Sequence, residues 1–282
     1  MKAAQRKVAR LFNEKMLPRL ILWIFSFIFI LPFYWMLVTS LKSDAELRTL
    51  PPTFFPMQPL FEHYVSTVQF IPFFRYMWNS TVIMFFSVIG TIVSNSFIAY
   101  GFSRISWRGR EAVFVVVIAT MFIPFPVLIV ALFDIFASLH LINTYLPLIL
   151  PTYFGSAFSI FMMRQYLLTI PKEISSAGLI DGANEFQIFS RLIFPLMKPV
   201  IAVVGIFAAL ASWNDFLGPL IYLQNQDMYT LPIGLQFFRS QYNVEYSLLM
   251  AASTLVVLPV LLVFLCFQRF FVEGITIGAI KG

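Results

Sequence analysis

Six long apolar stretches alternate with shorter polar or proline-rich segments along the chain. A helix needs about 20 predominantly apolar residues to cross the hydrocarbon core of a bilayer, and each stretch reaches that length. Lipid gives the edge of an open sheet no hydrogen-bonding partner, so helices are the expected secondary structure. The pattern predicts an all-α integral membrane protein with six transmembrane helices near residues 20–41, 78–102, 112–134, 145–167, 199–223 and 247–271.

Composition agrees with this pattern. Hydrophobic residues make up 60% of the chain and charged residues only 11%, against roughly 25% charged residues in soluble domains. The net charge of +6 lies in short segments between the apolar stretches, which favours anionic lipid and membrane topology over nucleic acid. Cys266 is the only cysteine, and His63 and His140 are far apart, so we expect neither a disulfide nor a metal site.

The distribution of Lys and Arg predicts the orientation of the chain in the membrane. With the N-terminus in the cytosol, 15 of the 19 basic residues fall in inner segments, and only Lys42, Arg48, Arg75 and Arg239 fall outside. The first apolar stretch is too long for a signal peptide and lacks an A-x-A cleavage site, so we expect a retained anchor. Both termini are expected in the cytosol, with a cytosolic segment at 1–19, a transmembrane domain at 20–271 and a cytosolic tail at 272–282.

The predicted inner loop between the fourth and fifth helices, residues 169–198, carries the clearest local pattern. Ile174, Ala177 and Ile180 have helical spacing, which predicts a short helix with one apolar face. Asp181-Gly182 then supplies a turn, because glycine adopts positive φ without strain.

A second short helix is expected directly after this turn. Asn184 and Gln187 have the spacing of a capping box. Phe186 and Phe189 place bulk on one side of the helix, and Pro195 is expected to end it. The loop is therefore predicted to form a helix–turn–helix outside the lipid.

Two interpretations of this loop are open from the residues alone. One is an amphipathic segment lying on the membrane surface, which would be expected to carry several Lys or Arg residues. The loop is barely basic, since Lys172 and Arg191 stand against Glu173, Asp181 and Glu185. This balance favours the other interpretation, docking onto a protein partner.

The loop resembles the EAA loop of ABC-importer permeases, whose pattern is roughly E-A-A-x-x-D-G-A, an apolar helix and then L-P. Residues 179–183 and 193–196 match its core, whereas Ser176-Ala177-Gly178 replaces the usual Glu-Ala-Ala. In that family this loop is the coupling helix that binds the ATP-hydrolysing subunit, and we call residues 169–198 the coupling loop. By this resemblance the ATPase-coupling residues are Glu173, Ser176, Ala177, Gly178, Asp181, Gly182, Ala183, Phe186 and Phe189.

The resemblance extends over most of the chain. It includes Asn79-Ser80, Trp213-Asn214-Asp215-Phe216, residues 231–236 and the ending 268–282, and it is closest to the MalG-like subunit of maltose-type carbohydrate importers. It implies the type I importer permease fold, with six transmembrane helices and a coupling helix. It also implies a bacterial cytoplasmic (inner) membrane location.

Two further segments are expected to contact partners. The outer loop, residues 224–246, mixes aromatic, amide and charged side chains, a composition suited to a wet protein contact. By resemblance it reaches toward the sugar site of a solute-binding protein through Asp227, Tyr229, Gln236, Arg239 and Tyr242; a passive connector is the alternative. By resemblance the tail reaches between ATPase subunits through Gly278, Lys281 and Gly282; a disordered end is the alternative.

Polar residues within the apolar stretches are candidates for the pore or a gate. They are Asn214, Asp215, Tyr153 and Ser156. A second role considered for Asp215 is a brace for a helix break before Gly218-Pro219, and a structural hydrogen-bonded carboxylate is the alternative. Helix packing is the alternative for the tyrosine and the serine.

The chain contains no G-x-x-x-x-G-K-[ST] motif, so another polypeptide must hydrolyse any ATP. The resemblance implies a permease forming half of the translocation pathway of an ATP-driven importer of sugars or oligosaccharides. Its partners would be a second homologous permease, two copies of an ATPase subunit that binds ATP and Mg, and a solute-binding protein.

An ion-gradient-driven secondary transporter is the alternative function. It predicts inverted repeats with broken helices and ion ligands near the midplane. The sequence shows at most one acidic residue there and no clear repeat. Disaccharides, longer oligosaccharides, uronate oligomers and glycerol-phosphate compounds all remain possible substrates.

Overall fold

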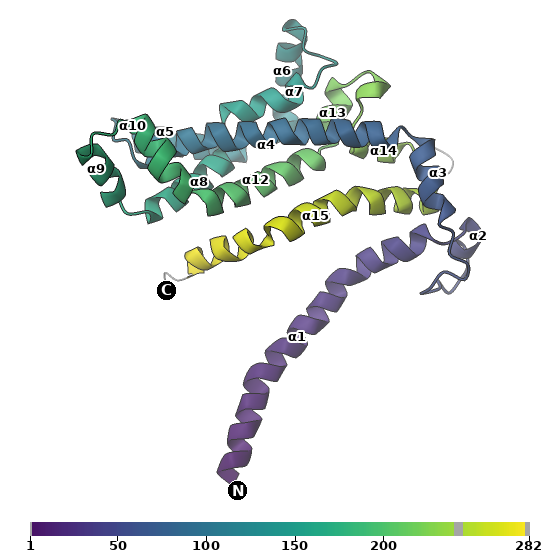
Figure 1. The fold of residues 1–282 in the computed structure, drawn as a ribbon. Coiled ribbons are helices and arrows are strands. Elements are labelled where there is room, and N and C mark those ends of the chain that lie inside the picture. The colour runs from purple at the N-terminus through teal and green to yellow at the C-terminus, as the bar shows by residue number, and fades with distance from the viewer. Residues whose placement is uncertain (1, 240–244, 280–282) are drawn as a thin grey trace. The chain divides into compact units, whose positions relative to one another are not determined.

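The computed structural model describes residues 2–239 and 245–279, with side chains described for 16–239, 245–266 and 268. All regular elements in these ranges are helices, which confirms the predicted fold class (Figure 1). Among the described residues, four helical segments are long and apolar enough to span a membrane, namely Met16–Ser40, Phe73–Ser103, Leu146–Thr169 and Tyr246–Cys266. Two bent helix pairs bring the number to six if each pair counts as one span.

The chain divides into two compact units, and each is described by itself. The first contains residues 1–71 and 237–257, and the second contains residues 72–236 and 258–282. In the first unit lie α1 (Lys2–Ser40), α2 (Asp44–Leu47), α3 (Glu62–Phe70) and the first part of α15 (Tyr246–Ala279).

Buried hydrogen bonds join distant segments within the first unit. The Thr67 hydroxyl of α3 donates to the Leu248 carbonyl of α15 at 3.2 Å. The buried Ser247 hydroxyl donates to the Lys42 carbonyl at 2.8 Å. Thus α15 begins against the segment that follows α1.

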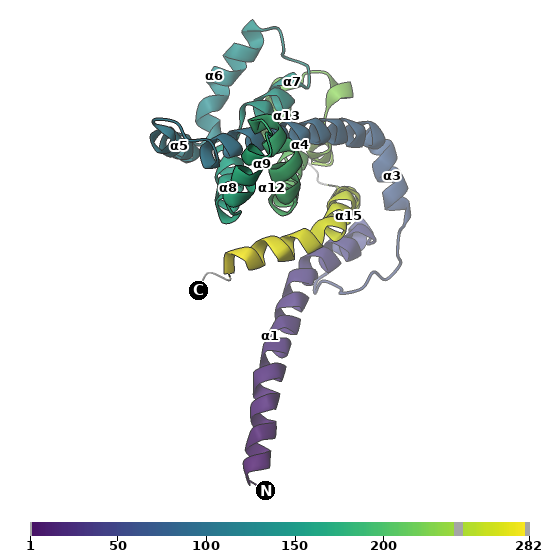
Figure 2. The same ribbon diagram turned by 60° about the vertical axis from the view of Figure 1, so that its left-hand side comes forward.

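The second unit is built around α4 (Phe73–Ser103). This helix packs mainly against α12 (Lys198–Trp213) and α8 (Ala157–Thr169), which lie beside it in both views (Figures 1 and 2). The remaining elements of the unit are α5 (Arg110–Ala119), η1 (Thr120–Phe122), α6 (Phe125–Ser138), α7 (Leu146–Ile149), η2 (Leu150–Phe154), α9 (Glu173–Ile180), α10 (Glu185–Gln187), the π-helix η3 (Ile188–Ile193), α11 (Phe194–Leu196), α13 (Leu217–Tyr222), η4 (Gln226–Met228) and α14 (Leu231–Gln236).

The span predicted at 112–134 is formed by a bent pair of helices and not by one continuous helix. The chain bends by 99° between Arg110–Phe122 and Phe125–Ser138. Ile123 is extended, with ψ of 113°, because it precedes Pro124 and the proline ring disfavours the helical conformation in the residue before it. A search for apolar length alone could not detect this break.

The span predicted at 199–223 is also interrupted, close to Gly218-Pro219, where a helix break was considered from the sequence. The helix α12 ends at Trp213, and α13 begins only at Leu217. The Asp215 carboxylate accepts a hydrogen bond from the Gly218 N–H at 3.1 Å and so satisfies a free donor at the start of α13. The predicted 145–167 helix is likewise interrupted at Gly155, whose φ is 95°.

Candidate coupling loop and polar cavity

The turn of the coupling loop has the geometry that its sequence predicts. Gly182 follows α9 with φ of 80°. Its N–H donates to the Leu179 carbonyl at 3.1 Å, and the Ala183 N–H donates to the Gly178 carbonyl at 2.9 Å. These two bonds form a Schellman motif, which satisfies carbonyls left free at the end of the helix.

The second helix of the loop starts with the predicted capping box. The Gln187 N–H donates to Asn184 Oδ1 and the Asn184 N–H donates to Gln187 Oε1, both at 2.9 Å. The helix ends at Leu196, one residue after the predicted end at Pro195, and the chain bends by 77° between Leu196 and the start of α12 at Lys198.

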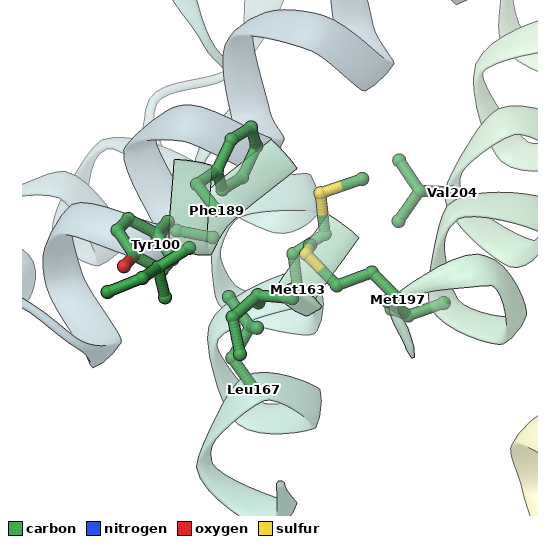
Figure 3. Close-up of a cluster of buried hydrophobic side chains, with 10 residues drawn as sticks. Tyr100, Met163, Leu167, Phe189, Met197 and Val204 are labelled. Carbon is green, nitrogen blue, oxygen red and sulfur yellow. The ribbon is translucent and has the colours of Figure 1, made fainter. Parts of the chain in front are cut away.

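One apolar cluster joins the coupling loop to the long helices. We call it the inner cluster; its buried members are Ala99, Tyr100, Met163, Leu167, Ile188, Phe189, Ile193, Met197, Val200 and Val204 (Figure 3). The Phe189 ring lies 5.1 Å from the Tyr100 ring and 4.6 Å from the Phe97 ring, centroid to centroid. Loop, α4, α8 and α12 therefore share one buried core.

Polar contacts strengthen this connection. The Tyr100 hydroxyl donates to Glu185 Oε2 at 2.6 Å. The Arg104 guanidinium donates to the carbonyls of Leu167 and Ile170, at 2.8 and 2.7 Å, at the end of α8. Burial lowers the pKa of Arg104 from its ordinary value, but a guanidinium titrates so far above neutrality that it stays charged.

The tip of the coupling loop exposes large apolar side chains. Ile180 is 85% exposed, Phe186 is 65% exposed and Leu179 is 53% exposed. Of the expected coupling residues, those exposed are Glu173, Ser176, Ala177, Asp181, Gly182 and Phe186.

The other expected coupling residues face the interior. Phe189 is buried and Ala183 packs against the inner cluster. Gly178 is buried as well, and a Cβ there would lie 2.8 Å from Leu192 Cδ1. The absence of a side chain at Gly178 allows α9 to lie close against η3.

A polar cavity of about 530 Å³ lies between the other end of α4 and α8, α12 and α13. Its lining residues are Ser80, Ile83, Ser87, Thr91, Leu148, Pro151, Thr152, Gly155, Ser156, Phe158, Ser159, Phe207, Ala208, Ala211, Ser212, Asp215, Pro219 and Thr230. The cavity and the inner cluster thus occupy different stretches of the same three long helices.

The structure brings together two of the four pore or gate candidates. Asp215 and Ser156 both line the polar cavity. Asn214 is exposed, and its amide donates to the Leu210 carbonyl at 2.8 Å. Tyr153 lies against Gly90, where a Cβ would come within 2.5 Å of its ring.

Several lining residues were not among the pore or gate candidates predicted from the sequence. Ser80, Ser87 and Thr91 follow one another at intervals of seven and four residues, which places them on one face of α4. This polar stripe in an apolar stretch was a detectable signal. Asn95, one turn further, is fully buried and its side-chain oxygen accepts from the Ser156 N–H at 2.8 Å, which supports the chain at the Gly155 break.

The outer loop is attached to the start of α4. The Asn79 amide donates to the carbonyls of Asp227 and Tyr229, both at 2.9 Å. Arg75 forms an ion pair with Asp227 at 3.1 Å, and the Leu231 N–H donates to the Ser80 hydroxyl at 2.9 Å. The loop segment that follows α13 is therefore held over one end of the cavity.

The remaining candidates lie outside this arrangement. Gln236 is exposed at the end of α14, and Arg239 is exposed in the first unit. Gly278 lies in α15, whereas Tyr242, Lys281 and Gly282 fall outside the described residues. The described residues contain no group of His, Cys, Asp and Glu suited to a metal ion.

Comparison with solved structures shows the same fold in a known transporter. A chain in the crystal structure of a bacterial ABC transporter involved in import of the acidic polysaccharide alginate has a TM-score of 0.79. The match covers 93% of this chain and 97% of that chain, at 22% sequence identity.

Comparison with known sequences identifies relatives at higher identity. The arabinooligosaccharides transport system permease protein AraQ of Bacillus subtilis is 36% identical over 91% of this chain and 92% of its own length. The lactose transport system permease protein LacG of Rhizobium radiobacter is 32% identical, again over 91% and 92%. These relatives are permeases, so the prediction of a transporter subunit rather than an enzyme is confirmed.

The family match covers residues 95–277, more than half of the chain. It includes α8, the coupling loop and α12, the elements that share the inner cluster. It confirms the predicted ABC-importer family and disfavours the ion-gradient alternative. The chain belongs to the family described as binding-protein-dependent transport system inner membrane component.

Proposed function

We propose that this chain is a permease subunit of an ATP-driven carbohydrate importer and that its coupling loop is the docking site of the ATPase subunit. The observation that carries the proposal is the exposed apolar tip of the coupling loop, continuous through the inner cluster with α4, α8 and α12. Relatives named for arabinooligosaccharides and lactose support a carbohydrate as the transported substrate.

The exposed tip suits a protein partner better than lipid. Ile180, Leu179 and Phe186 present apolar surface, while the exposed Glu173 and Asp181 beside them would be repelled by an anionic membrane. Burying one such large apolar side chain in an interface contributes roughly 1.5–3 kcal/mol. A cleft on the ATPase that takes Ile180 would therefore gain a large share of the docking free energy.

Movement of the docked loop would be transmitted directly to the long helices. Phe189 is buried against α4, and the Tyr100 hydroxyl is bonded to Glu185. Closely packed interiors resist compression, so a displaced loop displaces the helices that share its core. ATP and Mg would be bound by the ATPase, and its closure would open the cavity toward the solute-binding protein.

The outer loop is the candidate contact surface for the solute-binding protein. Asn79 and Arg75 hold it over the cavity, and opening requires these contacts to loosen or to move together. A second homologous permease would supply the other half of the pathway, with two ATPase copies below the pair. In this proposal the protein lies in the bacterial inner membrane, with the coupling loop and both termini on the cytosolic side.

Replacement of Ile180 by glutamate tests the docking site. The charge prevents burial of the exposed apolar tip, and we expect at least a tenfold loss of ATPase subunit recovered with the purified permease, because 1.4 kcal/mol corresponds to tenfold in affinity. Co-purification from membranes, with quantification of both subunits, measures this ratio.

Ile105→Glu is the matched control. Ile105 is also exposed, at 40%, but it lies between α4 and α5, outside the coupling loop. The control is expected to retain the ATPase subunit. Equal recovery of the ATPase with the Ile180 variant and with wild type would show that the coupling loop is not the docking site.

A further inference from the structure

We infer that the polar cavity binds an uncharged saccharide unit and discriminates against anionic ones such as uronates and sugar phosphates. This inference rests on the proposed carbohydrate function and selects among its possible substrates. The volume of about 530 Å³ falls within the roughly 300–1,000 Å³ typical of small-molecule pockets.

The cavity wall is rich in hydroxyl groups, the complement of a polyhydroxylated ligand. Eight of its lining residues are serine or threonine. The hydroxyls of Ser87 and Thr230 are buried and have no hydrogen-bond partner among the described residues. A buried polar group is normally satisfied by protein, water or ligand, so these two hydroxyls are available to a guest molecule.

Aromatic surface accompanies the hydroxyls. The rings of Phe158 and Phe207 both line the cavity and meet edge to face, at 5.7 Å and 88°. A sugar ring has apolar C–H faces as well as polar edges, and such a face packs favourably on an aromatic ring. A wall with both kinds of surface matches both sides of a saccharide.

The charge of the wall argues against an anion. Asp215 is the only ionisable side chain in the lining of the described cavity, which includes no Lys, Arg or His. Proteins bind carboxylate and phosphate groups mainly through Arg and Lys, and a carboxylate in the wall repels them. Asp215 accepts a hydrogen bond from the Gly218 N–H, and its remaining lone pairs suit the hydroxyl donors of a neutral sugar.

The inner cluster closes the cavity toward the coupling loop. Along α4 the last lining residue is Thr91, and the inner cluster begins at Ala99, about 12 Å further at 1.5 Å per residue. Along α8 the lining ends at Ser159, and the cluster begins one turn later at Met163. A saccharide in the cavity would be held until the inner cluster moves.

The first experiment measures ligand protection in the complete transporter, without its binding protein, in nanodiscs. Ser212→Cys in a Cys266→Ser background gives one thiol in the cavity wall, and its rate of maleimide labelling is followed. We expect maltose, lactose or arabinobiose to slow labelling, and digalacturonate or glycerol 3-phosphate at equal concentration not to slow it. Protection by an anionic probe as strong as by the best neutral probe, or no protection by any neutral probe, would overturn the inference.

The second experiment measures ATP-driven uptake of the protecting probe into proteoliposomes containing the transporter and its binding protein. Thr230→Val replaces the hydroxyl by a methyl group and keeps the shape of the side chain. We expect a roughly three- to tenfold loss of uptake, which corresponds to the loss of one neutral hydrogen bond. Thr230→Ser keeps the hydroxyl and is expected to retain uptake. Thr81→Val is the control, since its hydroxyl bonds the Met77 carbonyl on the same helix and does not line the cavity.

The outcomes separate this inference from the proposed function. Absence of ATP-driven uptake of every carbohydrate probe would contradict the proposed function. Normal ATP-driven uptake of a neutral sugar by the Thr230→Val variant would leave the proposed function intact and overturn the assignment of the cavity.

Discussion

The Schellman turn at Gly182 offers a sharp test of the role of the coupling loop. Gly182 has φ of 80°, and no heavy atom lies within 4 Å of a Cβ built there. The Cβ of a valine at this position would therefore meet no other atom, and the substitution is expected to act through the backbone. The left-handed conformation costs an ordinary L-residue roughly 1–2 kcal/mol, and a β-branched side chain is the least tolerant of it.

The expected consequence is a loop that leaves its docking geometry. Relief of the strain would break the bonds from Gly182 to Leu179 and from Ala183 to Gly178, which fix the angle between α9 and η3. With 1.4 kcal/mol per factor of ten, Gly182→Val should lower the population of the docked geometry roughly five- to thirtyfold. Gly182→Asn is the matched control, because asparagine tolerates left-handed φ.

The assay is ATP hydrolysis by the complete transporter with saccharide-loaded binding protein. Stimulated activity of the valine variant should fall by the same factor while its insertion into the membrane is unchanged, and the asparagine variant should stay within about twofold of wild type. Wild-type stimulation in the valine variant would refute the coupling role. Equal loss in both variants would show that any side chain at Gly182 blocks the partner, and that backbone conformation is not the cause.

Three further predictions test other contacts. Tyr100→Phe removes the hydroxyl bonded to Glu185 and should reduce stimulated ATP hydrolysis about three- to tenfold while leaving ATPase recovery unchanged; an unchanged hydrolysis rate would exclude this bond from coupling. Asn79→Ala removes two part-buried hydrogen bonds to the outer loop, whereas Arg75→Ala removes an exposed ion pair and an exposed hydrogen bond to Asp227, which water weakens. We expect Asn79→Ala to reduce binding-protein-stimulated hydrolysis more than Arg75→Ala. The opposite order would contradict the assigned anchor. Gly90→Leu places a side chain where Thr152 and Tyr153 already lie, 2.5 Å from the Cβ position, and should lower the thermal unfolding temperature in detergent. An unchanged melting curve would show that α4 and η2 are not so closely packed at this point.

The coupling loop was the segment most predictable from sequence, because its structure depends on neighbouring residues. A glycine after a short helix and an asparagine three residues before a glutamine are local patterns, and the turn and capping box form as predicted. The end of the helix was also predicted to within one residue, since it stops at Leu196 directly after Pro195.

Breaks inside the membrane helices were not predictable from apolar length. Hydropathy averages over a window, so it does not register the extended Ile123 before Pro124 or the gap after Trp213. The Asp215 that supports the second gap was noted as a possible brace, but its position in a cavity wall depends on α4 and α8.

The sequence by itself determined the membrane class, the family pattern and the local geometry of the coupling loop, because apolar length and cap residues act over short stretches of chain. Tertiary structure alone decided which side chains line the same cavity. Ser87 of α4, Ser156 before α8 and Asp215 after α12 are far apart in the sequence, and only helix packing makes them walls of one cavity. Exposure of Ile180 and burial of Phe189 within one loop were likewise decided by the neighbouring helices, which cover one side of the loop and leave the other uncovered.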